Sequence, residues 1–265
     1  MPIDALPQIM VAPNGARRTT RDHPSVPMQL DDTIATALAC KAAGAGGLHA
    51  HVRDTDGGHI LDAGLYLELL AEMKHRAPDF TVQITTEAVG QYTPKEQRAL
   101  VTAVMPDFVS IALREMVAGE DDKDLCKFYH WAYVSGIGVQ HILYTPEEVL
   151  KLASFVEKGV IPAQDLEVLF VLGRYSTNQQ SSVSDMSPFV ANATQVLKDA
   201  EWALCAFGQQ ETSCLAEAVR QGGKARIGFE NNLHNSDGSI AVDNAERVHE
   251  LVAELKREKL ADMPN

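Results

Sequence analysis

Eight short apolar segments, separated by longer stretches of helical periodicity, constrain the fold of this chain more than any other feature. The segments span residues 9–13, 47–52, 81–87, 108–113, 138–144, 166–173, 201–208 and 224–231. They are apolar enough to be covered on both faces, which is typical of parallel strands. Strict alternation of strand and helix over eight repeats predicts an α/β fold, the (β/α)8 TIM barrel, rather than an open doubly wound sheet.

The stretches between the strands carry clear helix signals. Thr93-Pro94-Lys95-Glu96 and Thr145-Pro146-Glu147-Glu148 each place Thr at an N-cap, Pro at the first helical position and Glu at the third. Further helices are expected near residues 32–43, 63–76, 122–135, 188–198, 212–221 and 244–259. Because no linker divides the chain, we expect a single barrel domain over residues 1–265.

The charge of the chain restricts its partners. Its 36 acidic and 23 basic side chains give a net charge of -13, which opposes binding to nucleic acid or to an anionic membrane. An anionic ligand must therefore meet a local cluster of Arg or Lys. The start of the chain does not resemble a signal peptide, so a cytoplasmic protein is expected. The 4 cysteines show no CxxC spacing and are expected to be reduced thiols.

The stretch HAHVRD, residues 49–54, places two histidines in an apolar strand. Side chains alternate between the two faces of a strand, so His49 and His51 point one way while Leu48 and Ala50 point the other. We expect the apolar pair to face the helices. The histidines then face the barrel interior near its mouth.

The eighth strand repeats this pattern, with Arg226, Gly228 and Glu230 on one face. An inward Arg and Glu are costly unless they are paired or bound to a ligand. The second and eighth strands both flank the first, so Glu230 can approach the two imidazoles. Two His and one Glu with an open fourth position form a known catalytic zinc set. The alternative is that the histidines are hydrogen-bonded core residues.

Three motifs carry a resemblance to a known family. APNGARR (12–18), HAHVRD followed by DGGHILD (56–62), and RIGFENNL (226–233) resemble the beta-keto acid cleavage enzymes in register over nearly the whole chain. The resemblance implies a TIM barrel with Zn2+ held by His49, His51 and Glu230. It also implies that a 3-keto acid reacts with acetyl-CoA to give acetoacetate and a new acyl-CoA, in a homo-oligomer that is a dimer or a tetramer.

The resemblance implies roles for other residues as well. Arg226 would grip a substrate carboxylate or orient a base, and Thr85 would take the place of a hydroxyl that holds the ligand. The alternatives are an ordinary strand threonine and a structural ion pair of Arg226 with Glu230 or Asp54. Gly208 follows the seventh strand, where such barrels bind phosphates, and Arg174 could add charge there for coenzyme A.

The chain departs from the family at the position of its base. Asn231 stands where the best-known members carry an aspartate, and an amide cannot take a proton. Glu87 and Glu115, at the ends of the third and fourth strands, are candidate replacements. Arg114, beside Glu115, could pair with a substrate carboxylate. Ordinary solvated loop charges are the alternative for all three.

Two further departures concern the substrate. The fifth strand reads VQHI from Val139 to Ile142 and lacks the family's glutamate, and Asn14 replaces a glutamate of the aminohexanoate-cleaving member. We therefore expect a neutral or anionic side chain on the substrate. His141 is either a third imidazole of the site or a packed strand histidine, and we favour the second.

Two rival functions stay open. A metal-dependent hydrolase of the amidohydrolase type also uses an HxH pair, but places it on the first strand and needs further histidines; turnover without acetyl-CoA would support it. A non-catalytic barrel that binds an acyl-CoA or a keto acid would bind ligand tightly without forming product.

Overall fold

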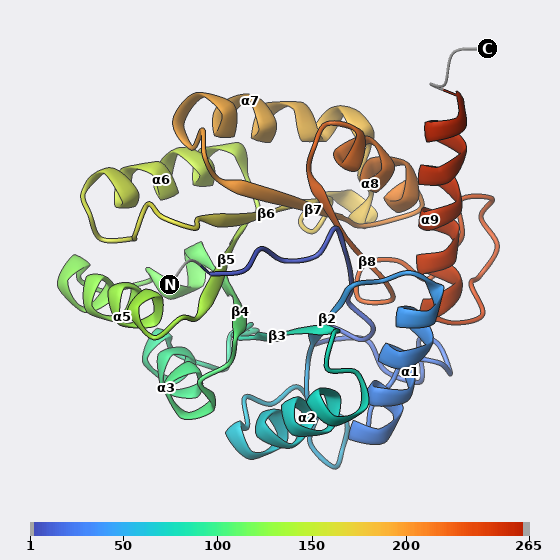
Figure 1. The fold of residues 1–265 in the computed structure, drawn as a ribbon, viewed down its shortest axis with the longest axis horizontal. Helices are drawn as coiled ribbons and strands as arrows, with labels where there is room; N and C mark the ends of the chain where they lie inside the picture. The colour runs from blue at the N-terminus through green and yellow to red at the C-terminus, as the bar shows by residue number, and fades with distance from the viewer. Residues whose placement is uncertain (1–2, 262–265) are drawn as a thin grey trace.

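The computed structural model describes residues 3 to 261, and its eight strands form a closed parallel barrel in which each strand pairs with the next and β8 pairs with β1 (Figure 1). The strands are β1 (Ile9–Val11), β2 (Gly47–Ala50), β3 (Thr81–Thr85), β4 (Phe108–Ala112), β5 (Gly138–Leu143), β6 (Glu167–Leu172), β7 (Glu201–Ala206) and β8 (Lys224–Ile227). The predicted (β/α)8 TIM barrel is confirmed.

The helices lie outside the ring of strands, and α9 packs beside α1 (Figure 1). They are α1 (Leu30–Ala43), α2 (Ala63–Arg76), α3 (Pro94–Val104), α4 (Leu113–Met116), α5 (Asp122–Val134), α6 (Pro146–Glu157), α7 (Ser187–Val196), α8 (Glu211–Arg220) and α9 (Asn244–Ala261). Two short 3-10 turns, η1 (Thr177–Gln179) and η2 (Val183–Met186), lie between β6 and α7. The sequence does not predict α4, η1 or η2.

Both predicted helix starts are confirmed, and one of them forms a complete capping box. At α3 the Thr93 side chain accepts a hydrogen bond from the Glu96 N–H, and the Glu96 carboxylate accepts one from the Thr93 N–H. At α6 Thr145 is the N-cap residue and the helix begins at Pro146, as predicted, but the Thr145 side chain makes no cap hydrogen bond. Glu148 instead accepts hydrogen bonds from Tyr144 N at 2.6 Å and Arg114 Nε at 2.7 Å.

The predicted eighth strand extends too far. β8 ends at Ile227, because Gly228 has a φ of 141° and a Cβ there would lie 2.5 Å from the Ala12 carbonyl oxygen. The chain then turns, with Asn231 N donating to Gly228 O at 2.9 Å. Glu230 therefore lies in a turn beyond the strand and not on its face. Phe229 also lies beyond the end of β8, and its side chain packs against Val26 and Ala241.

The barrel interior has an apolar half and a polar half. Side chains of β4 to β7 form the apolar half: Ala112, Ile142, Leu169, Val171, Ala203 and Cys205, with Phe207 above them. Gln83 lies in the polar half, and its Nε2 donates across the barrel to Gln140 Oε1 at 3.3 Å. Leu6, Met10 and Phe108 pack together as a separate cluster. The candidate site lies at the polar half, where Gln83 contacts His49.

The cysteines and the helices bear on the redox state of the chain and on whether it crosses a membrane. All of Cys40, Cys126, Cys205 and Cys214 are free thiols, as predicted. Within residues 3–261, every helix is too short or too polar to cross a membrane.

Candidate metal centre and active site

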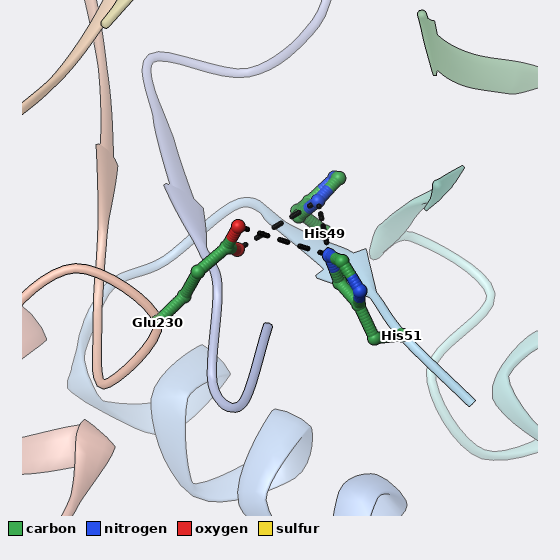
Figure 2. A group of neighbouring side chains, drawn as sticks. All are labelled: His49, His51 and Glu230. Carbon is green, nitrogen blue, oxygen red and sulfur yellow. Dashed lines mark hydrogen bonds and ion pairs between the residues drawn. The ribbon is translucent and has the colours of Figure 1, made fainter. Parts of the chain in front are cut away.

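Three side chains from distant parts of the chain meet at the mouth of the barrel (Figure 2). β2 and the residue that follows it place His49 Nε2 and His51 Nε2 3.1 Å apart. The turn after β8 brings the Glu230 carboxylate to them, with Oε2 3.7 Å from His49 Nε2 and Oε1 3.7 Å from His51 Nε2. The donor atoms of the three residues all lie within 4.8 Å of one another.

This geometry fits a divalent ion. Ligands about 2.1 Å from a tetrahedral ion lie about 3.4 Å from each other, close to the three separations given above. Both imidazoles are buried, and Glu230 Oε2 is a buried oxygen with no hydrogen-bond partner among the described residues. A bound cation would satisfy that oxygen. The three residues could therefore hold a metal ion.

The imidazoles are in the protonation state that a metal needs. Burial, and then the neighbouring Arg226, hold the pKa of His49 well below 6.5, and burial is the main cause of the equally lowered pKa of His51. Both rings are therefore neutral. His49 Nδ1 lies 2.9 Å from Gln83 Oε1, which places the proton on Nδ1 and leaves Nε2 as a lone pair.

Arg226 lies at the floor of the site as a buried cation with unused donors. Its Nη2 is 3.6 Å from Glu230 Oε1, and its side chain is 6% exposed. Its Nε and Nη1 atoms are buried and find no hydrogen-bond partner among residues 3–261. A buried guanidinium with free donors is suited to an oxyanion of a ligand.

Glu87 is the second carboxylate of the site. One of its oxygens lies 4.0 Å from His51 Nδ1 and the other 3.7 Å from Arg174 Nη2. Burial, and then repulsion by Glu230, raise its pKa to about 7. The Thr85 hydroxyl accepts a hydrogen bond from Glu87 N at 3.1 Å and so fixes the start of the loop that carries Glu87.

A cavity of about 120 Å³ opens above these residues. Its walls come from the loops after β1 and β6 and from the ends of several other strands: Asn14, Gly15, Ala16, Arg17, Arg18, Glu87, Tyr144, Val171, Arg174, Gln179, Phe207, Arg226 and Glu230. The Asn14 amide donates to Pro27 O at 3.0 Å and His51 O at 3.1 Å, while its Oδ1 is buried without a partner in the described part of the chain.

The structure places the other candidates outside this cavity wall. Glu115 Oε2 accepts hydrogen bonds from Ala88 N at 2.9 Å and Gln97 Nε2 at 3.1 Å. Arg114 pairs with Glu148 and lies over the Tyr144 ring, 4.6 Å from its centroid. Both residues therefore already have partners within the protein.

Gly208 and Asn231 also lie outside the wall. Gly208 has a φ of 91°, and a Cβ there would lie 2.6 Å from Gln180 Oε1, so this glycine lets the segment after β6 pack closely. Asn231 is buried, and its Nδ2 donates to Arg226 O at 3.4 Å and to Glu211 Oε1 at 3.5 Å. Neither Gly208 nor Asn231 lines the cavity.

Sequence reasoning missed several residues that build the site. Arg53 is buried and donates to Arg18 O at 2.9 Å and also to Gly15 O, so it holds the loop that covers the centre. The His59 ring lies 5.3 Å from the ring of His51. Gln83 could have been found from strand alternation, since it shares a face with Thr85.

His141 is not part of the site. It packs on the helix side of β5, with its ring 5.3 Å from the ring of Tyr129 on α5. Burial lowers its pKa to about 3. The prediction of a packed strand histidine is confirmed, and this residue does not supply the extra imidazole that an amidohydrolase-type site needs.

Comparisons with known proteins agree with the motifs. A 3-keto-5-aminohexanoate cleavage enzyme of Fusobacterium nucleatum subsp. nucleatum is 24% identical over 253 residues, covering 92% of this chain and 90% of that protein. A 3-oxoadipate:acetyl-CoA acetyltransferase of Cupriavidus necator is 22% identical over 251 residues, covering 92% of this chain and 87% of that protein.

Among solved structures, ObcA in its apo form superposes with a TM-score of 0.68 at 13% identity. The match covers 89% of this chain but 63% of ObcA, and at this identity it shows the fold alone. The model of the beta-keto acid cleavage enzyme family matches residues 8–260. The protein therefore belongs to the beta-keto acid cleavage enzymes and is an enzyme that breaks a carbon-carbon bond of a beta-keto acid.

Proposed function

We propose that the protein is a zinc-dependent enzyme that exchanges acyl groups between a 3-keto acid and acetyl-CoA. The products are acetoacetate and a new acyl-CoA. The observation that carries this proposal is the convergence of His49, His51 and Glu230 beside the unpaired donors of Arg226, at the floor of one cavity. The name of the Cupriavidus necator relative, which includes acetyl-CoA, supports the choice of co-substrate.

The donor set favours zinc, because two imidazoles and one carboxylate with a position left open form a known catalytic site for this ion. When bound, the ion is a Lewis acid that polarises the 3-keto oxygen. Arg226 binds the substrate carboxylate through its free Nε and Nη1 donors, which fixes C2 of the substrate near Glu87. Gln83 keeps the His49 ring in the required tautomer.

The reaction needs one proton acceptor, and Glu87 holds the proton. Glu87 takes a proton from C2 of the keto acid, and C2 then bonds to the acetyl carbon of acetyl-CoA as the carbon-sulfur bond breaks. The released CoA thiolate attacks C3, the C2–C3 bond breaks, and the proton returns from Glu87 to C2. All atoms are conserved, and no oxidant or reductant is required. Asn231 takes no part in proton transfer.

We assign the proton acceptor to Glu87 and not to Glu115 because only Glu87 lines the cavity. Glu87 lines the cavity and faces His51, whereas Glu115 accepts two hydrogen bonds from the protein away from the cavity wall. A carboxylate in the cavity also argues against the non-catalytic barrel, since the loss of the aspartate at Asn231 need not abolish proton transfer.

A labelling experiment tests the proposal. Zinc-loaded protein is incubated with a 3-keto acid and acetyl-CoA carrying carbon-13 in the acetyl group, and the products are followed by NMR. We expect the label in acetoacetate and an unlabelled new acyl-CoA. His49→Ala should abolish the exchange, while His75→Ala, which changes an exposed histidine at the end of α2, should not.

Two results would redirect the assignment. Cleavage of the keto acid by water in the absence of acetyl-CoA would identify a hydrolase. Saturable binding of keto acid and acetyl-CoA without any product, over 3-keto acids with neutral, acidic and basic side chains, would identify a binding protein.

A further inference from the structure

We propose that Arg17, Arg18 and Arg174 at the cavity mouth bind a second carboxylate, so that the substrate is a 3-keto acid with a carboxylate at each end. This inference rests on the proposed function, because it names the substrate class of the same site. Family membership alone does not decide the substrate class, because the names of the two relatives describe one substrate with an amino group and one dicarboxylate.

The cavity is basic although the protein is acidic. Four arginines line it against two glutamates, Glu87 and Glu230, whereas the whole chain carries 36 acidic and 23 basic side chains. One glutamate is a candidate metal ligand, and a divalent ion would add further positive charge. A ligand with two negative groups matches this local charge, and an ammonium group would be repelled.

The arginines lie at two depths. Arg226 is buried at the floor beside Glu230. In the proposed reaction it binds the carboxylate next to the keto group. Arg18 and Arg174 are half-buried, and Arg17 is exposed at the rim. A second anionic group several bonds away from the first would therefore reach a second group of guanidinium ions.

The three arginines of the mouth keep donors free. Arg17 makes no hydrogen bond or ion pair with any residue the structure describes, although its side chain lines the cavity. Arg18 uses Nη2 to donate to Asn231 O at 3.2 Å. Arg174 lies over the Phe207 ring, 5.2 Å from its centroid, with Nη2 3.7 Å from Glu87. The loop that carries Arg17 and Arg18 is fixed, because Arg53 binds its carbonyl oxygens.

The phosphates of coenzyme A carry the same kind of charge as a carboxylate, so the experiment must separate the two sources. 3-Oxoadipate and 3-oxohexanoate have the same chain length and differ by the distal carboxylate. If the mouth binds that carboxylate, a change at Arg17 alters the preference between the two acids. If the mouth binds the coenzyme, both acids are affected equally and the KM for acetyl-CoA rises.

Kinetics of the zinc-loaded protein give the first test. The wild-type protein should have a higher kcat/KM for 3-oxoadipate than for 3-oxohexanoate. Arg17→Gln should lower the ratio of the two kcat/KM values by about 10- to 100-fold, the size of one charge-assisted hydrogen bond. Arg21→Gln is the matched control, since Arg21 is exposed in the same loop outside the cavity wall. An unchanged ratio, or a preference for 5-amino-3-oxohexanoate, would overturn the inference.

Binding gives a second test that does not depend on turnover. Calorimetry of the zinc-loaded protein without acetyl-CoA should show glutarate binding at least 10-fold more tightly than butyrate, with Arg17→Gln removing most of the difference. If no keto acid is turned over but this difference is seen, the proposed reaction fails and the dianion site stands. If exchange occurs while glutarate and butyrate bind alike, the dianion site fails and the reaction stands.

Discussion

We predict that the affinity of the candidate centre for zinc depends on Gln83, which contacts His49. Its Oε1 lies 2.9 Å from His49 Nδ1 and its Nε2 is held by Gln140, so the acceptor is fixed and fully buried. Gln83→Leu keeps the volume of the side chain close to the original and removes that acceptor. The ring of His49 would then lack a partner for its Nδ1 proton.

The size of the effect comes from the difference between the ion-free and ion-bound states. Without an ion, the proton can move to Nε2 of His49, where His51 Nε2 is 3.1 Å away as an acceptor. With an ion bound, the proton must stay on Nδ1 in a buried site without a partner. An unsatisfied buried donor costs about 1–3 kcal/mol, so metal affinity should fall by about 5- to 150-fold.

Competition with a zinc-binding dye measures this change in affinity. Gln83→Glu is the matched variant, because it restores an acceptor at the same place and should retain wild-type affinity or exceed it. Circular dichroism of both variants checks that the barrel is intact. Equal zinc affinity of the wild type and Gln83→Leu would show that metal binding by His49 does not depend on its hydrogen bond to Gln83.

Three further predictions concern the loop over the centre, the buried ion pair and the pH dependence of stability. Gly15→Ala should weaken zinc binding in the same dye assay, because Gly15 has a φ of 60° and a Cβ there would lie 2.5 Å from Glu230 Cγ; unchanged affinity would contradict the close packing. Arg247→Met should lower the free energy of unfolding in urea by about 3–5 kcal/mol, because it leaves the fully buried Glu211, 3.0 Å from Arg247 Nη2, without its partner. The double variant with Glu211→Gln should recover part of this loss. A small effect of Arg247→Met alone would show that the buried ion pair contributes little to stability. His141 has a folded pKa of about 3, below the 6.5 of the unfolded chain, so the unfolded state takes up the proton first and stability falls as pH drops below 6.5. From pH 7 to pH 5 this costs about 2 kcal/mol, which His141→Leu should remove from the pH dependence of urea unfolding; identical pH profiles would show that the burial of His141 is not the cause.

The fold could be predicted because its signals are local and repeated eight times. Each strand and most helices follow from periodicity and capping residues, and the order of the strands follows from the right-handed βαβ connection. The ends of the strands could not be predicted. Gly228 looks like a strand residue in the sequence, and only its φ of 141° and the Ala12 carbonyl oxygen, 2.5 Å from where a Cβ would lie, show why the strand ends before it.

Of the candidate metal ligands, His49 and His51 could be predicted from strand alternation and from the motif. Glu230 could be predicted from the motif alone, because it lies in the turn after β8 and not on a strand face. The remaining residues of the site depend on loop conformation, which alternation does not describe. Glu87 and Glu115 are equivalent in sequence as strand-end carboxylates, yet one faces the cavity and the other accepts the Ala88 N–H. Arg114 and Arg174 are likewise equivalent in the sequence as loop arginines, yet Arg114 pairs with Glu148 while Arg174 lines the cavity. Long-range packing decides these cases.

A crystal structure of the zinc-loaded protein, with an anomalous difference map at the zinc edge, tests directly whether the three side chains bind one ion. We expect one peak per chain at the barrel mouth, bonded to His49, His51 and Glu230 together. A map with no peak there, with the two imidazoles still in mutual contact and the Glu230 carboxylate apart from any ion, would contradict it.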